Sequence, residues 1–132
     1  MSVTLTMSRF VYYNANPVHN LVIDCTVRAI SFFTGKSWED VYDDICAEGK
    51  RQHNMPSSNA VWSEYLWKLG YTRVPLPNTC PLCYTVKDFC IEHPRGKYLL
   101  ALYEHVVAVE DGYYYDTWDS GNMTVLYYWR KE

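Results

Sequence analysis

Hydrophobic and polar positions recur with two different periods along the chain. In the first two thirds, apolar positions recur at helical spacing between capping residues and glycines, which predicts helices over 24–34, 37–49, 58–69 and 85–93. After that the period changes to two, which predicts strands over 97–102, 105–109, 113–118 and 124–129. Helices followed by strands predict an α+β domain, with N-terminal helices packed on a C-terminal antiparallel β-meander.

Several local signals mark where these elements begin and end. Asp24 can cap the first helix and Gly35 ends it, whereas Ser37 and Asp40 resemble a capping box for the second. Asp111-Gly112 is the clearest hairpin turn, because this pair favours the left-handed backbone of a two-residue loop.

Length and composition restrict the class of protein. The chain has 132 residues, which fits a single domain over 1–132. Its net charge of −3 argues against a nucleic-acid binder with a broad basic face, and its 17% aromatic content argues against disorder. Thirteen Tyr and five Trp are an unusual excess, and we expect most of them to be packing residues of a small sheet.

The cysteine count and the start of the chain predict a compartment. Five cysteines cannot all pair, and the first thirteen residues lack the basic-then-apolar order of a secretory signal. No apolar run is long enough for a membrane span, so we expect no membrane partner. We therefore expect a cytoplasmic protein with free thiols.

Cys25 is the best candidate for a reactive thiol. It follows Asp24 at the first turn of the predicted first helix, where unpaired amides and the helix dipole favour a thiolate. Most free cysteines are small buried apolar residues instead, and Cys46 and Cys90 fit that description because they lie in apolar stretches of predicted helices.

His105 and Asp116 are the candidate base and its orienting acid. His105 opens an apolar strand, where a polar ring needs a reason to be. If Asp111-Gly112 is a two-residue turn, Asp116 is a diagonal neighbour of His105 on the same face of the hairpin. A three-residue turn would favour Asp119, and we predict Asp116. Thiol, histidine and acid then form a nucleophile, a base and its orienter.

These residues resemble the papain-like cysteine peptidase superfamily. In that family a Cys opening the first long helix meets a His and an Asn or Asp from a following antiparallel sheet, and the order Cys25, His105, Asp116 agrees. Asp116-Thr117-Trp118 is similar to the Asn-Ser-Trp segment of papain-type enzymes, in which the Trp covers the His–Asn hydrogen bond. The resemblance implies that Trp118 covers the bond between His105 and Asp116. DCTVRAI and HVVAVEDGYYYDTWDSG together resemble small proteins of bacteriophages and prophages.

The oxyanion donor is where the chain departs from this family. Papain-type enzymes have a Gln six residues before the Cys, and position 19 here is His. His19 or Asn20 is the candidate donor, together with the Cys25 amide.

A metal site is the main competing interpretation. Cys80 and Cys83 form a Cys-x-x-Cys pair, followed by Cys90 and His93, and such a pair can hold zinc. The last two fall on a predicted amphipathic helix at a spacing unlike common zinc fingers, so we expect no metal and no cofactor. We also expect the Cys80/Cys83 pair to be reduced in a cytoplasmic protein.

The resemblance implies a cysteine peptidase or related thiol hydrolase that cleaves a peptide, isopeptide or amide bond of a protein or peptide substrate. The alternative is a phage or prophage interaction protein that keeps the fold and binds a host protein without turnover. Either would act in the host cytoplasm if it is phage-encoded.

Overall fold

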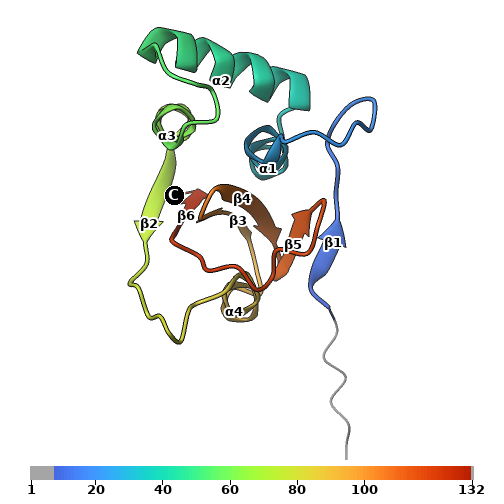
Figure 1. Cartoon of the computed structure of the whole chain (residues 1–132), viewed down its shortest axis with the longest axis vertical. Coiled ribbons are helices and arrows are strands. Elements are labelled where there is room, and N and C mark those ends of the chain that lie inside the picture. Colours follow the sequence, from blue (N-terminus) through green and yellow to red (C-terminus); the bar gives the residue numbers. More distant parts are fainter. Residues whose placement is uncertain (1–7, 132) are drawn as a thin grey trace, which may run out of the picture.

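The protein is a three-layer α+β domain with one central sheet. We describe it from a computed structural model, which places residues 8–131. Helices α1 and α3 lie on one face of the sheet, α2 packs across these two helices, and α4 covers the opposite face (Figure 1). The α+β class predicted from the change of period is confirmed.

The helices follow the predicted ranges closely. Gly35 ends α1 in the left-handed region, as predicted, and Ser37 caps α2 by accepting a hydrogen bond from the Asp40 amide. The second helix does not end at Gly49, because Gly49 remains helical and the chain turns at His53. The helices are α1 (Cys25–Thr34), α2 (Trp38–Gln52), α3 (Asn59–Lys68) and α4 (Val86–Glu92).

The sheet has six strands and is mostly antiparallel. Its order is β1-β5-β4-β3-β6-β2, and the pairing of β1 with β5 is parallel. The strands are β1 (Phe10–Tyr12), β2 (Tyr71–Pro75), β3 (Lys97–Leu102), β4 (His105–Glu110), β5 (Tyr113–Asp116) and β6 (Tyr127–Lys131).

The predicted four-strand meander is only partly right. Strands β3, β4 and β5 are consecutive neighbours, but β6 pairs with β3 rather than with β5. The segment between β5 and β6 crosses the α4 side of the sheet, where the Val125 amide bonds to the Tyr84 carbonyl at 2.8 Å (Figure 1). Strands β1 and β2 were not predicted, because they are short and lie among residues with no clear period of two.

Alternation along the central strands builds two cores. Leu99, Ala101, Val106 and Ala108 pack beneath the α1–α3 layer, whereas their neighbours Leu100, Leu102, Val107 and Val109 pack against α4. The aromatic excess is largely packing, as expected. Phe32 of α1, for example, stacks on Tyr115 of β5 with 4.3 Å between ring centroids.

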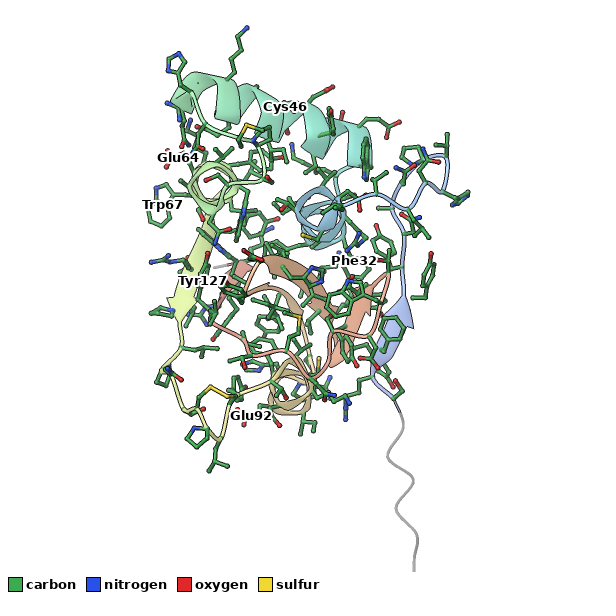
Figure 2. All side chains as sticks on the ribbon, viewed as in Figure 1. Phe32, Cys46, Glu64, Trp67, Glu92 and Tyr127 are labelled. Carbon is green, nitrogen blue, oxygen red and sulfur yellow. A yellow bond between two sulfur atoms is a disulfide. The ribbon has the colours of Figure 1, made fainter. Side chains whose placement is uncertain are left out.

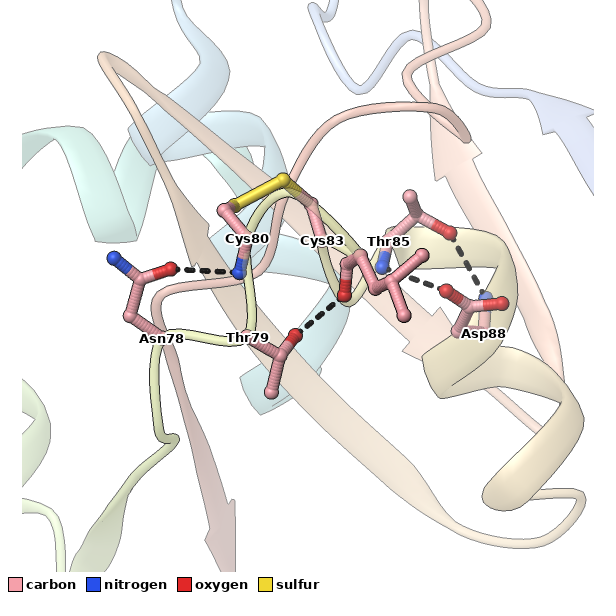
Figure 3. The surroundings of a disulfide bond; sticks show 7 residues. Asn78, Thr79, Cys80, Cys83, Thr85 and Asp88 are labelled. Carbon is pink, nitrogen blue, oxygen red and sulfur yellow. Dashed lines mark hydrogen bonds between the residues drawn. A yellow bond between two sulfur atoms is a disulfide. The ribbon is translucent and has the colours of Figure 1, made fainter.

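The expectation that all thiols are free is wrong for one pair. Cys80 and Cys83 form a disulfide on the loop between β2 and α4 (Figure 3). A tight turn brings them together, because the Leu82 amide bonds to the Thr79 carbonyl at 3.0 Å and the Thr79 hydroxyl donates to the Leu82 carbonyl at 2.6 Å. The two Cα atoms are therefore only 4.1 Å apart.

The other two residues of the zinc interpretation lie elsewhere in the fold. Cys90 is fully buried in the core beneath α4, and burial raises the pKa of its thiol to about 12. His93 stacks on Phe89, and its Nδ1 lies 2.9 Å from the Phe89 carbonyl. Within residues 8–131, no group of His, Cys, Asp and Glu side chains is arranged to hold a metal ion.

Candidate active site

Cys25 is the first residue of α1 and lies against the start of β4. Helix α1 packs across β4, so the helix N-terminus meets the strand end that carries His105. The Cys25 thiol interacts with His105, with the Val106 backbone and with the Thr26 side chain. The structure thus brings together the predicted nucleophile and the predicted base.

His105 is joined to Asp116 by a short hydrogen bond. Its Nε2 lies 2.6 Å from Asp116 Oδ2, which leaves Nδ1 as the ring nitrogen for the Cys25 contact. The pairing of Glu110 with Tyr113 confirms the predicted two-residue turn. Asp119, the acid that a longer turn would have favoured, instead accepts a hydrogen bond from the Tyr114 hydroxyl.

Asp116 is completely buried and has four hydrogen-bond donors. Besides His105, the Ser120 hydroxyl donates to Oδ2 at 2.8 Å, and Oδ1 accepts from the Thr117 amide at 2.8 Å and from Arg28 at 2.9 Å. Burial raises the pKa of this carboxyl, but the hydrogen bond and charge of His105, followed by the bonds from Ser120 and Thr117, bring it below its usual value. Asp116 is therefore an ionised acceptor.

The protonation of Cys25 and His105 is set by their contact. Burial raises the pKa of the Cys25 thiol, but the hydrogen bond and charge of His105 and the Val106 and Thr26 contacts outweigh it, so the net pKa is lowered. Burial lowers the pKa of His105, yet its contacts with Asp116 and Cys25 raise it to about 9. Both directions favour a thiolate paired with an imidazolium.

A cleft of about 560 Å³ is lined by both Cys25 and His105. Its walls come from the start of α1, from α2 and from the 56–59 segment that leads into α3. Cys46 of α2, labelled in Figure 2, is not the buried core residue that the sequence predicted, because it is partly exposed and lines the same cleft as a second free thiol. Gly49 allows the α2–α3 connection to turn closely, because a Cβ there would lie 2.8 Å from the Asn54 carbonyl oxygen.

Trp118 packs against the histidine. The two ring centroids are 4.7 Å apart at an interplanar angle of 37°, and Trp118 remains 46% exposed. The ring therefore contacts His105 and is itself partly open to solvent.

The candidate oxyanion donors His19 and Asn20 lie outside the cleft lining. Both are exposed on the loop before α1, where the amides of His19 and Asn20 bond to the Asn16 carbonyl and side chain. The first amides of α1 are better placed, because they belong to the turn that begins with Cys25 and have no acceptor within the helix.

Two residues of the site, Arg28 and Ser120, were not predicted from the sequence. Arg28 had a detectable signal: it is the one charged residue within 25–34, four positions after Asp24, which places both on one face of a helix. Ser120 follows a turn after β5, and its position near Asp116 depends on a loop path that carries no sequence pattern.

The fold and the site define an α+β domain in which a cysteine contacts a hydrogen-bonded His–Asp pair beside a cleft. No protein family, curated protein or solved structure matches this chain. Between residues 8 and 131, no helix combines the length and the apolar character needed to cross a bilayer.

Proposed function

We propose that the protein is a papain-like cysteine peptidase or related thiol hydrolase, which cleaves a peptide, isopeptide or amide bond through an acyl-enzyme on Cys25. The observation that carries the proposal is the set formed by Cys25 and His105, which line the cleft, and the buried Asp116 behind them. Cys25 contacts His105, and His105 Nε2 lies 2.6 Å from the buried Asp116. This is the nucleophile, base and orienter arrangement of acyl transfer.

In the first half of the reaction, the Cys25 sulfur forms a bond to the substrate carbonyl carbon. As the C–N bond breaks, the His105 imidazolium gives its proton to the departing amine. In the second half, water attacks the thioester carbon while His105 takes a proton from it, and the C–S bond breaks to release the acid. Asp116 holds the His105 ring in one orientation throughout, and Trp118 limits the access of water to the His105–Asp116 bond.

The oxyanion is stabilised by the N-terminal amides of α1, starting with that of Cys25. Developing negative charge there also meets the positive end of the helix dipole. The helix amides therefore take the place of His19 and Asn20 as hydrogen-bond donors to the oxyanion. The side chains of these two residues are exposed outside the cleft lining.

The alternative of binding without turnover has one observation in its favour. The loop before Cys25 exposes several apolar side chains, namely Val18, Leu21, Val22 and Ile23. Such a surface fits a protein partner whether or not that partner is cleaved. In this alternative, the Cys25→Ala substitution leaves the binding and the biological effect of the protein intact.

An electrophile competition between two thiols of one cleft tests the proposal. Cys25 and Cys46 are both partly exposed free thiols that line it, but only Cys25 has a histidine partner there. We expect iodoacetamide near pH 6.5 to modify Cys25 at least about tenfold faster than Cys46, because the thiolate is the nucleophile. Peptide mapping by mass spectrometry reads both sites, and His105→Ala should abolish the difference. Equal rates in the wild type would exclude an activated Cys25.

A screen of fluorogenic ester, amide and ubiquitin-type isopeptide substrates then separates an enzyme from a binding protein. We expect turnover in the wild type and none with Cys25→Ala. Activity that survives this substitution would contradict the assignment of the nucleophile.

A further inference from the structure

Arg28 is a buried cation placed between two carboxylates. It is 3% exposed, and its guanidinium donates through Nη1 to Asp24 Oδ1 at 2.5 Å and through Nη2 to Asp116 Oδ1 at 2.9 Å. Burying an arginine is costly unless its charge is paired and its donors are used. The Asp24–Arg28–Asp116 bridge meets that need and reaches the acid that holds His105.

Asp24 occupies the capping position of α1 but does not cap it. Its side chain makes no hydrogen bond to the helix amides, because one oxygen accepts from Arg28 and the other from Trp38 Nε1 at 2.9 Å. A carboxylate on those amides would place negative charge beside Cys25 and occupy the donors that acyl transfer needs. Arg28 and Trp38 keep Asp24 turned away from them.

The charges of the bridge also bear on His105. Arg28 alone would neutralise Asp116 and weaken its hold on the imidazolium, but Asp24 balances the guanidinium. The net charge of the three groups is then −1, the charge of Asp116 alone. One further titratable group, Tyr13 from the segment after β1, interacts electrostatically with Arg28 and Asp24, and burial raises the pKa of its hydroxyl, so it stays neutral.

We propose that Arg28, balanced by Asp24, is a positioning residue for the Cys25–His105 pair: it fixes Asp116 toward His105 and withdraws Asp24 from the helix N-terminus. This role rests on the proposed function, because positioning matters only if Cys25 and His105 react. Its tests measure the titration and the proton exchange of His105 and need no substrate.

Asp24→Asn tests the charge balance. This variant leaves Arg28 uncompensated beside Asp116, so we expect the NMR titration midpoint of His105 to fall by about one pH unit, a tenfold change in proton affinity. Trp38→Phe is the matched control, since it removes a hydrogen bond from the same carboxylate and changes no charge; its midpoint should stay at the wild-type value. Equal shifts in both variants, or none in Asp24→Asn, would overturn the charge balance.

Arg28→Lys tests the positioning. Lysine retains the charge but lacks the planar fork that reaches both carboxylates. We expect the His105 Nε2–H proton to exchange with solvent about tenfold faster, because Asp116 is held less firmly. An unchanged exchange rate in a folded Arg28→Lys protein would reduce Arg28 to a packing role, and this variant decides the matter if Asp24→Asn does not fold.

The two proposals fail in distinguishable ways. If Cys25 of the wild type reacts no faster than Cys46 while Asp24→Asn still lowers the His105 midpoint, the hydrolase is rejected and the role of Arg28 stands. If Cys25 is activated but neither variant changes His105, the hydrolase stands and Arg28 has no positioning role.

Discussion

At the scale of single residues, the site depends on which acid holds His105. Asp116 and Asp119 are close in sequence and both follow the Asp111-Gly112 turn, yet their surroundings differ. Asp116 is fully buried against His105, whereas Asp119 is exposed and bonds to the Tyr114 hydroxyl. The difference follows from where the strand ends, because Asp116 is the last residue of β5 and Asp119 lies on the loop that follows it.

A pair of substitutions separates the two acids. Asp116→Asn removes the charge that raises the His105 pKa and favours the wrong ring tautomer, so we expect alkylation of Cys25 at pH 6.5 to slow by about tenfold or more. Asp119→Asn makes the same change in net charge without touching His105 and should leave the rate within about twofold. Alkylation quenched at successive times and followed by mass spectrometry measures the rate at Cys25 in each variant. Similar rates in the two variants would contradict the assignment of Asp116.

The sequence was informative about this site wherever a local rule was enough. The start of a helix at Cys25 and the two-residue turn each depend on a few neighbouring residues, so the approach of Asp116 to His105 could be worked out from register. The Arg28 bridge was not predicted, because it joins residues 88 positions apart. The disulfide between Cys80 and Cys83 was not predicted, because it depends on the tight turn that brings the two residues together and not on the cysteine count.

At the scale of elements, the β4–β5 hairpin carries the geometry of the site. Its turn places Asp111 and Gly112 in the left-handed region, with φ of 51° and 80°. Gly112 is also buried, and a Cβ there would lie 3.0 Å from Arg9 Nη1 and 3.1 Å from the Cys90 carbonyl oxygen. The turn thus requires glycine for its backbone and for its surroundings.

Gly112→Ala should therefore cost more than a positive φ alone. We expect a loss of about 2–4 kcal/mol in the free energy of unfolding, from backbone strain together with crowding. Gly35→Ala is the matched control: its φ is 77° with nothing within 4 Å of the added Cβ, so about 1 kcal/mol is expected. Urea unfolding followed by circular dichroism measures both. Equal losses would show that the hairpin turn tolerates the crowding.

The two edge strands of the sheet could not be predicted from the hydrophobic pattern. Strand β1 has three residues and β2 ends in Pro75, so neither has the length or alternation that identified the central strands. Strand β1 is held by parallel pairing with β5, and β2 by pairing with β6. Their positions are set by tertiary contacts rather than by local sequence.

At the scale of the whole molecule, the Cys25–His105 pair affects how stability depends on pH. A histidine with a folded pKa of about 9 against an ordinary 6.5 stabilises the fold below pH 6.5, and this contribution is lost as the pH rises through about 9. The lowered pKa of the Cys25 thiol has the opposite sign, because it adds stability as the pH rises. Where the folded thiol has ionised and the unfolded thiol has not, the folded pair holds one proton on His105 and the unfolded pair holds one on Cys25, so the two effects offset each other.

Cys25→Ala removes this compensation. The unfolded variant releases the His105 proton above pH 6.5, whereas Asp116 retains that proton in the folded protein, so the free energy of unfolding should fall as the pH rises. We expect the variant to lose about 1–2 kcal/mol more than the wild type between pH 6.5 and 8.5, since one proton is worth at most about 1.4 kcal/mol per pH unit. His19, His53 and His93 are common to both proteins and cancel in the comparison. If the free energy of unfolding of the variant and of the wild type depended on pH in the same way across this range, Asp116 alone would not hold an additional proton on folded His105.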